Sequence, residues 1–366
     1  MEDYGIQLTP EEESKLDAMV ERIHERVAKE AMTPRERFEK IAKGEPVDRL
    51  PVWVNGTGLH VPKTYGVPHG ALYEDPKLAL LAYVNHLDRF GGDTLSLFRF
   101  SLGDAEFGAM TTMTDFGVPF TIKGYVEEYE DIAKIKFPKI KKDGQLPWTL
   151  WMISMLKEKL GDIMPIYSFI TTPGLTAVCP GARSYQQAGI DMIQNPNMTH
   201  ALAALALKFY IQFGQAQLEA GADACNMVDA VADVSPKQFR EFMYPYMCGL
   251  YHALDGKVMW CAADDVSHVM EDYAKVGIKE FYLGNKQPLD FAEEVCGKYG
   301  VTIRYSMDPQ VLVHGPVERI REETKKLAEE GKKYGRFILG TAALDTDTPP
   351  ENVDAFVQAA REFGQF

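Results

Sequence analysis

The sequence predicts an α/β protein, a (βα)8 TIM barrel with an N-terminal helical extension and an insertion between the second and third strands. Eight short β-rich runs alternate with longer helical stretches, which is the count that a closed parallel barrel needs. No Gly-rich dinucleotide-binding turn follows the first run, which disfavours a doubly wound open sheet, the competing fold. The length of 366 residues suits a single barrel with additions.

Residues 1–46 are predicted to form the helical extension, and residues 47–366 the barrel domain. The first helix begins at Thr9-Pro10-Glu11-Glu12, which has capping-box spacing and a proline at the first helical position. Apolar residues at helical spacing follow it. A second start signal, Thr33-Pro34-Arg35-Glu36, opens a helix that ends at Gly44.

The predicted strands are the runs at residues 51–54, 94–98, 164–169, 224–228, 257–261, 280–283, 301–305 and 336–340. Amphipathic helices are predicted between them, for example at residues 198–220, 265–276, 288–299 and 317–334. The stretch of about 60 residues between the second and third strands is too long for a plain connection. We expect this stretch, which includes residues 116–126, to form an extra hairpin and helices over one end of the barrel.

The composition indicates a globular protein of the cytoplasm. A formal net charge of −14 argues against a nucleic-acid partner, because phosphate binding needs clustered Lys and Arg. No apolar run approaches the roughly 20 residues of a membrane helix, and the acidic residues 1–13 lack an apolar signal core. The five cysteines form no CxxC pair, which indicates reduced thiols. The sequence leaves open whether the chain forms a homodimer.

In such a barrel the chemistry lies where strands end and βα loops begin. That position nominates residues 55–60, Arg99, Thr171, Thr172, Asp229, Trp260, Cys261, Gly284, Asn285, residues 306–308 and Thr341. The structural alternative for each is an ordinary residue of the barrel rim. Aromatic and sulfur side chains near the rim also suit a flat apolar ligand, although barrel core explains them as well; they are Trp53, Phe98, Phe100, Met227, Trp260, Tyr305 and Met307.

A set of short motifs occurs along the chain in the order typical of one known family. The motifs are Met32-Thr33-Pro34-Arg35-Glu36-Arg37-Phe38, Gly44-Glu45-Pro46-Val47-Asp48-Arg49-Leu50-Pro51-Val52, Tyr129-Glu130-Asp131-Ile132, Pro173-Gly174-Leu175-Thr176, Glu219-Ala220-Gly221-Ala222-Asp223, Ser235-Pro236-Lys237-Gln238-Phe239, Met307-Asp308-Pro309, His314-Gly315-Pro316-Val317-Glu318 and Thr348-Pro349-Pro350-Glu351-Asn352-Val353. No single motif is specific, but the ordered set resembles the uroporphyrinogen decarboxylase superfamily, which implies a barrel.

The loop after the first strand departs from the decarboxylases of that family. Their Arg-rich segment grips the carboxylates of a porphyrinogen, whereas residues 54–62 here contain no arginine and one histidine. Because a substrate with many carboxylates needs several fixed cations, decarboxylation of uroporphyrinogen is disfavoured.

The other large branch of the superfamily that this sequence resembles transfers methyl groups to or from a corrinoid protein. Its thiol-methylating members carry a zinc site written His-x-Cys near the fifth strand end, with a second Cys late in the eighth. The matching positions are Met259-Trp260-Cys261 and Thr341-Ala342-Ala343-Leu344. Only Cys261 matches, and a thioether is a poor zinc ligand. Zinc stays open as a cofactor, but the usual His-x-Cys…Cys site is absent.

The function that this resemblance favours is methyl transfer from a methoxylated aromatic, a phenyl methyl ether, to the Co(I) of a partner corrinoid protein. The corrinoid (cobalamin) would be carried by that partner. Three alternatives remain: a methylcorrinoid:thiol methyltransferase of the coenzyme M kind with an altered metal site, a divergent uroporphyrinogen decarboxylase, and a non-catalytic binding barrel.

Residue roles follow from that hypothesis. A proton donor to the leaving phenolate contributes about 10²–10⁴-fold, and the candidates are His60, Asp229 and Tyr305. A metal on Cys261, with Asp229 or Asp233, is the alternative means of polarising the ether oxygen. The substrate-binding candidates are Asn55, Arg99, Trp260, Asn285, Met307 and Asp308. The structural readings are a carbonyl-bound loop histidine for His60, a turn-initiating residue for Asp308 and a surface ion pair for Arg99.

Overall fold

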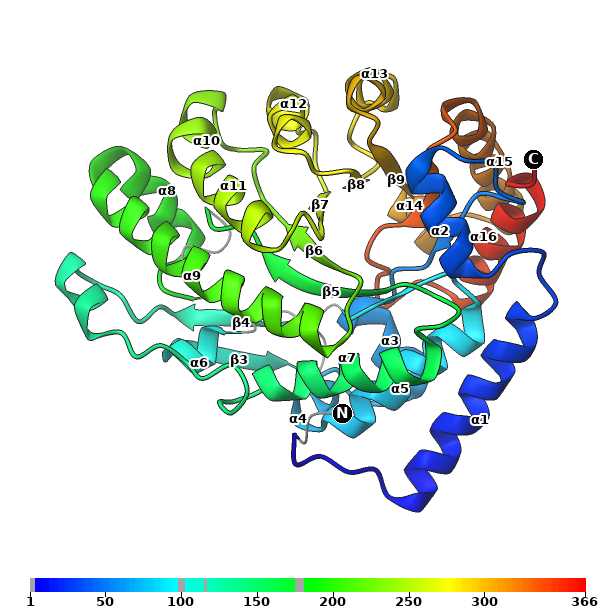
Figure 1. Ribbon diagram of the computed structural model, residues 1–366, viewed down its shortest axis with the longest axis horizontal. Coiled ribbons are helices and arrows are strands. Elements are labelled where there is room, and N and C mark those ends of the chain that lie inside the picture. The colour runs from blue at the N-terminus through cyan, green and yellow to red at the C-terminus, as the bar shows by residue number, and fades with distance from the viewer. Residues whose placement is uncertain (1–3, 98–102, 115–116, 175–180) are drawn as a thin grey trace.

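The computed structural model describes residues 4–97, 103–114, 117–174 and 181–366. In this part of the chain, eight parallel strands curl into a barrel in the order β1-β10-β9-β8-β7-β6-β5-β2, with helices outside it (Figure 1). The strands are β1 (Val52–Trp53), β2 (Leu95–Ser96), β5 (Ile166–Thr171), β6 (Ala224–Val228), β7 (Val258–Ala262), β8 (Glu280–Leu283), β9 (Thr302–Met307) and β10 (Phe337–Thr341). The predicted (βα)8 barrel is confirmed.

Helices occupy the connections between successive strands. They are α3 (Thr57–Tyr65), α4 (Ala71–Glu74) and α5 (Pro76–Phe90) after β1; α8 (Tyr185–Gln194) and α9 (Pro196–Ala220) after β5; α10 (Pro236–Phe242) and α11 (Tyr244–Ala253) after β6; α12 (Ser267–Val276) after β7; α13 (Leu289–Tyr299) after β8; α14 (Pro309–His314) and α15 (Val317–Tyr334) after β9; and α16 (Pro350–Phe363) after β10.

The long connection between β2 and β5 contains the predicted hairpin and helices. It consists of α6 (Asp104–Phe107), the antiparallel strands β3 (Met110–Thr114) and β4 (Gly117–Lys123), the 3-10 helix η1 (Tyr129–Lys134) and α7 (Leu146–Leu160). The hairpin follows the carboxyl end of β2, so it lies on the mouth side of the barrel. There the N–H of Val126 donates to the carbonyl of Ala182, in the connection that leaves β5 (3.1 Å).

Two helices, α1 (Pro10–Val27) and α2 (Pro34–Lys43), precede the barrel strands. Both begin with the predicted capping boxes, at Thr9 and Thr33, and α2 ends at Gly44 in the left-handed conformation. Helix α2 places the ring of Phe38 6.2 Å from the rings of both Trp53 and Tyr167. Because those residues lie on β1 and β5, Phe38 covers the barrel interior at its amino end.

Asp93 joins the two strands at the edges of the eight-stranded sheet. Its N–H donates to the carbonyl of Val52 on β1 (2.8 Å), and its Oδ2 accepts from the N–H of the same residue (2.7 Å). Asp93 lies two residues before β2. Its carboxylate therefore adds a second hydrogen bond to β1, beyond the one that its backbone N–H makes. Each edge strand has only two residues, so the hydrogen bonds of Asp93 contribute much of the contact that closes the barrel.

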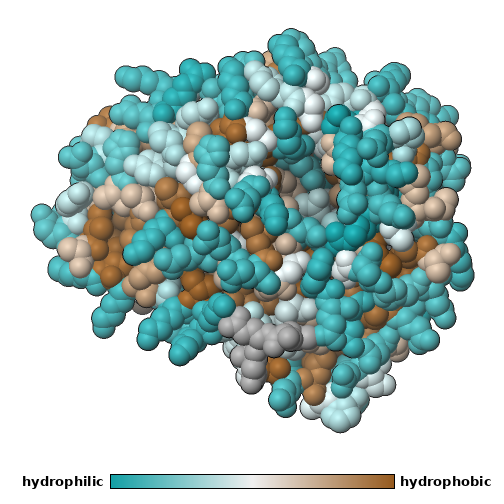
Figure 2. Space-filling model, viewed as in Figure 1, coloured by the Kyte–Doolittle hydropathy of each residue, from teal (hydrophilic) through white to brown (hydrophobic). Residues whose placement is uncertain are grey.

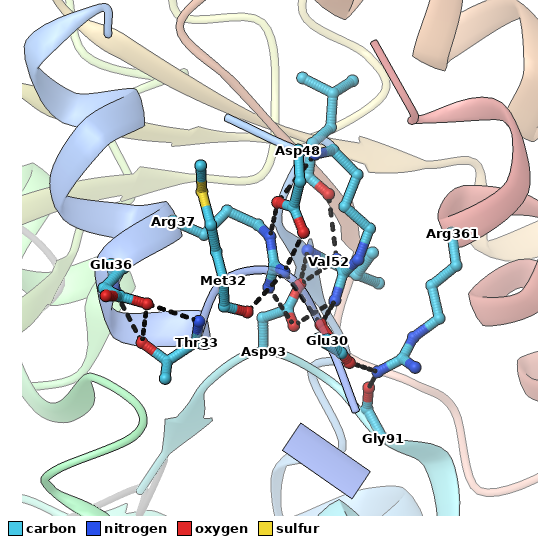
Figure 3. Close-up of polar contacts among 12 residues, drawn as sticks. Glu30, Met32, Thr33, Glu36, Arg37, Asp48, Val52, Gly91, Asp93 and Arg361 are labelled. Carbon is cyan, nitrogen blue, oxygen red and sulfur yellow. Dashed lines mark hydrogen bonds and ion pairs between the residues drawn. The ribbon is translucent and has the colours of Figure 1, made fainter. Parts of the chain in front are cut away.

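The Asp93 carboxylate also accepts from two buried arginines (Figure 3). Arg49 donates to both oxygens, at 2.6 and 2.8 Å, and Arg37 of α2 donates to Oδ1 at 3.2 Å. Arg37 and Arg49 both reach Glu30, which also pairs with Arg361 of α16 at 3.2 Å. The network therefore connects both ends of the chain to the barrel seam.

Hydrophilic residues cover most of the face in Figure 2, and apolar patches lie toward its left, the side where Figure 1 places α8 and the hairpin. Large apolar side chains are more than half exposed there; they include Met110, Phe120 and Ile122 of the hairpin and Ile193 of α8. None of the helices in the described ranges combines the length and the apolar character that a membrane span requires.

We expect Asp93→Asn to lower the free energy of unfolding by about 3–5 kcal/mol, because it leaves two buried guanidinium groups without their shared counter-charge. Urea denaturation measures this change. The matched control is Asp354→Asn, which breaks the partly exposed pair with Arg89 and should cost about 0–1 kcal/mol. Equal, small losses in both variants would contradict the importance given to Asp93.

We expect stability to fall in acid because of the same carboxylate. Burial raises the pKa of Asp93, but Arg49 and Arg37 outweigh burial and hold that pKa below its usual value of 3.8. A depressed folded-state pKa stabilises the protein above the unfolded-state pKa, and this stabilisation is lost as the pH falls through the folded-state pKa. Urea midpoints measured from neutral pH to below about pH 4 should therefore drop more steeply in the wild type than in Asp93→Asn.

Candidate functional site

Polar side chains gather inside the barrel, where side chains of a small barrel usually pack as apolar layers. We call Trp53, Asn226, Glu280, Tyr282, Arg304 and Ser306 the interior polar cluster. Residues two apart on a strand face the same side, which places Glu280 with Tyr282 and Arg304 with Ser306. The hydroxyl of Tyr167 on β5 donates to Oε2 of Glu280 on β8 (2.9 Å), and these strands are not neighbours. The contact crosses the barrel and shows that both side chains point inward.

Arg304 lies at the centre of this cluster, between two aromatic rings. Its guanidinium carbon is 3.6 Å from the ring centroid of Trp53 and 3.3 Å from that of Tyr282. Gly340 makes room for it, because a Cβ there would lie 3.2 Å from its Cγ and Nε. Arg304 itself pairs with Ile338, two residues earlier on β10, so its side chain leans toward the carboxyl end of the barrel.

The guanidinium of Arg304 has no hydrogen-bond partner within the described ranges. The residue is fully buried, and none of its three nitrogens forms a well-oriented hydrogen bond with the described residues, although the neighbouring Tyr282 side chain favours its charged form. Burial lowers the pKa of Arg304, because desolvation disfavours the charged form. Both amide atoms of Asn226 and the hydroxyl of Ser306 are likewise buried and unpaired. Such orphaned polar groups are rare in folded proteins, and a cluster of them indicates a ligand site.

Glu280 lies one layer below Arg304. Burial of its carboxyl raises its pKa to about 7, while the bond from Tyr167 and the charge of Arg304 act in the opposite direction. Its Oε1 is buried without a partner. The carboxyl therefore changes charge near neutral pH inside the barrel.

The structure brings two predicted site residues, Asn55 and Cys261, to the edge of this cluster. Nδ2 of Asn55 donates to the hydroxyl of Tyr282 (3.4 Å), and that hydroxyl donates to the carbonyl of Thr341 (3.0 Å). The strand register places Cys261 in one row with Tyr282 and Arg304. Asn55 therefore lies at the carboxyl-end rim of the barrel, above the arginine, and Cys261 lies level with the arginine.

Asp229 and Trp260 face the outer helix α12 instead. The carboxylate of Asp229 accepts from the hydroxyl of Tyr273 and from the N–H of Ala230 (2.9 Å). The ring of Trp260 stacks on Tyr273 at 3.7 Å and is fully buried between strand and helix. The backbone N–H of Asp229 donates to the carbonyl of Cys261 (3.1 Å), so the main chain of Asp229 borders the inner row.

The predicted residues after β8 and β9 lie apart from the interior polar cluster. Tyr305 alternates with Arg304 and faces outward, where its hydroxyl donates to the carbonyl of Gln287 (2.7 Å) and, at 3.3 Å, of Asn285. Asn285 is half-buried in the loop after β8, and Met307 is buried at the end of β9. Asp308 caps α14 by accepting from the N–H of Gln310 (2.9 Å).

His60 lies in helix α3, not in the predicted loop, and it is buried. Its Nε2 donates to the carbonyl of Thr348 (3.1 Å), and its Nδ1 is 3.0 Å from Nε2 of His86. Burial lowers the pKa of both histidines, so we assign both rings as neutral at pH 7. His60 therefore bridges α3, α5 and the segment before α16.

The donor set does not fit the three-ligand zinc site of the thiol-methylating relatives. Cys261 is present, but Met259 and Ala342 stand at the other positions. Asp233 is exposed, and its carboxylate accepts from the hydroxyl of Tyr185 at 3.4 Å. No three His, Cys, Asp or Glu side chains lie together in the described ranges in a way that could hold a metal. Arg99 lies outside the described residues.

The comparisons with known proteins assign the family. The family described as Uroporphyrinogen decarboxylase (URO-D) matches residues 33–363. The chain belongs to the uroporphyrinogen decarboxylase family. Its curated relatives include uroporphyrinogen decarboxylases from Geotalea daltonii, at 25% identity, and from Geobacter sulfurreducens, at 26%. Each alignment spans 344 residues and covers 90% of this chain and 99% of the relative.

Solved structures support the barrel fold of this member of the family. A methyltransferase from Methanosarcina mazei superposes with a TM-score of 0.80 at 24% identity, covering 91% of this chain and 99% of that one. A B12-independent methionine synthase from a Shewanella species has a TM-score of 0.54 at 11% identity, covering 86% of this chain and 98% of that one.

We expect Cys261 to resist alkylation in the native protein. Burial raises the pKa of its thiol to about 12, which leaves roughly one thiolate in 10⁴ at pH 8. After iodoacetamide treatment at pH 8, peptide mass spectrometry should show the half-buried Cys248 labelled before Cys261, and both labelled alike in urea. Rapid native labelling of Cys261 would show a thiolate and contradict this assignment.

Proposed function

We propose that this family member is a corrinoid-protein-dependent methyltransferase, which moves a methyl group from a phenyl methyl ether to the Co(I) centre of a separate corrinoid protein. The observation that carries the proposal is the interior polar cluster, in which a single arginine lies between the aromatic rings of Trp53 and Tyr282. Such a site suits a flat substrate with few charges. The fold likeness to a methyltransferase agrees with this choice.

The same cluster disfavours a porphyrinogen as the substrate. Arg304 is the one Lys or Arg on the eight barrel strands that the structure describes. The segment after β1, residues 54–62, contains no arginine. A substrate bearing many carboxylates would need several fixed cations in a dry site, because each buried carboxylate must be paired.

A thiol acceptor is disfavoured for a separate reason. Thiol activation in the relatives depends on a zinc-bound thiolate, and the residues at positions 259, 342 and 343 offer neither nitrogen nor thiolate ligands. Co(I), in contrast, is a strong nucleophile supplied by the partner. In the proposed reaction its electron pair forms the bond to the methyl carbon, while the carbon–oxygen bond breaks and its electrons pass to the phenolate oxygen.

The chain's contribution is to orient the ether and stabilise the leaving oxygen. Asn55 is placed for this at the rim, where its amide nitrogen makes only a long bond of 3.4 Å to Tyr282. A donor directed at an oxygen that gains charge in the transition state is worth about 10²–10³-fold. We therefore assign the hydrogen bond to the leaving oxygen to Asn55.

We expect methyl transfer from one or a few methoxylated aromatics when the protein is mixed anaerobically with a Co(I) corrinoid protein. The rise of methyl-Co(III) absorbance measures it. Asn55→Ala should lower the rate by about 10²-fold, because it removes the donor to the leaving oxygen. The control is Asn85→Ala, on the outer helix α5, which should keep the wild-type rate.

Absence of methyl-Co(III) absorbance with every ether in the panel, in the presence of a competent corrinoid protein, would refute the aryl-ether assignment. Turnover of uroporphyrinogen in the parallel assay would assign the chain to the decarboxylases instead. An unchanged rate in Asn55→Ala, with transfer intact, would remove Asn55 from the mechanism while leaving the reaction class in place.

A further inference from the structure

We infer that Arg304 is the anchor for a carboxylate on the substrate, so that the methyl donor is a methoxylated aromatic acid. The identity of the donor rests on the proposed function, whereas the anion site itself rests on the geometry around Arg304. The argument has three steps: the unpaired charge, the direction of its N–H groups and its depth in the barrel.

The first step compares two arginines that are equally buried. Arg37 is 0% exposed and donates five hydrogen bonds, to Glu30, Met32, Asp48 (two bonds) and Asp93. Arg304 is also 0% exposed but donates none to the described residues. A buried charge without a partner is costly, so a buried arginine requires hydrogen-bond acceptors. The chain supplies these acceptors at Arg37. The unmet requirement at Arg304 points to an acceptor supplied by a ligand.

The second step concerns which part of the guanidinium is available. The rings of Trp53 and Tyr282 lie within 3.6 Å of its carbon, so they cover its faces and leave its N–H edge. That edge matches a carboxylate, which accepts two parallel hydrogen bonds from an arginine. Asn226 and Ser306 add unpaired buried donors in the same interior. The carboxyl of Glu280 does not occupy the edge, because its Oε2 accepts from Tyr167 and its Oε1 has no partner.

The third step concerns depth. Arg304 lies mid-strand, two residues before Ser306, whereas Asn55 and Thr341 lie at the rim. We expect a corrinoid protein to approach from the carboxyl end, because Phe38 of α2 covers the amino end. The methyl group must then face the rim, and the group at Arg304 must be at the other end of the ring. This geometry selects acids with the methoxyl and carboxylate on opposite sides of the ring.

Direct binding tests the anion site without any methyl transfer. Isothermal titration should show that the wild type binds 4-methoxybenzoate and benzoate at least about 10-fold more tightly than methoxybenzene and benzamide, their neutral counterparts. Arg304→Met should abolish that preference. Arg304→Lys, which keeps the charge but lacks the planar fork, should retain only part of it. The matched control is Arg319→Met, an exposed arginine of α15, which should bind as the wild type does.

Stability measurements separate a binding role from a structural one. Arg304→Met should unfold at the same or a higher urea concentration than the wild type, because it replaces an unpaired buried charge with an apolar side chain. A marked loss of stability in Arg304→Met, with its preference for carboxylates unchanged, would assign Arg304 to the fold and overturn the inference. Equal affinity of the wild type for benzoate and benzamide would also overturn it.

The two proposals fail in different experiments. Binding of aromatic acids through Arg304 without any methyl transfer would refute the proposed reaction and leave the anion site standing. Transfer from neutral ethers at a rate that Arg304→Met does not change would refute the anion site and leave the reaction standing.

Discussion

The closure of this barrel depends on a carboxylate that takes the place of a strand hydrogen bond. The edge strands β1 and β2 have two residues each, too few for their backbones to hold the seam alone. Asp93 accepts from the N–H of Val52 and from two arginines, and one of these, Arg37, belongs to α2. The same charge that closes the sheet therefore fixes the helix whose Phe38 covers the amino end of the interior. Burying the three charged groups of Arg37, Arg49 and Asp93 is favourable here only because each one meets a partner of opposite sign.

The buried polar groups inside the barrel differ from those of the seam in their hydrogen-bond pairing. The polar atoms of Asn226, Arg304 and Ser306 are removed from water without partners, whereas Arg37, Arg49 and Asp93 of the seam each form several hydrogen bonds. Proteins keep such local conflicts mainly where function requires them, because stability alone would favour apolar side chains. Buried polar groups that have hydrogen-bond partners, as in the seam, hold the barrel together. We assign the buried polar groups without partners, in the interior, to substrate binding.

Sequence periodicity was sufficient for most of the fold, because each predicted strand is a short β-rich run and the first two helices begin with capping boxes. The sequence predicted the residues of the functional site less well. The end-of-strand rule nominated both Trp260 and Cys261, but neighbours on a strand face opposite sides, and only Cys261 faces inward. His60 was assigned to a loop because it follows the first predicted strand, yet tertiary contacts with His86 and Thr348 stabilise helix α3. Arg304 and Glu280 were missed because they lie within strands; the available signal was polar residues at alternate positions of otherwise apolar runs, as in Thr302-Ile303-Arg304-Tyr305-Ser306.

The pairing of β1 with β10 also determines when the protein can finish folding. Val52 is in register with Leu339, and the N–H of Phe366, the last residue of the chain, donates to the carbonyl of Asp48. During synthesis the first strand must therefore wait, without a sheet neighbour on that side, until β10 has left the ribosome. Contacts of such long sequence separation form slowly, and until they form the unpaired edge of β1 is open to association with other chains.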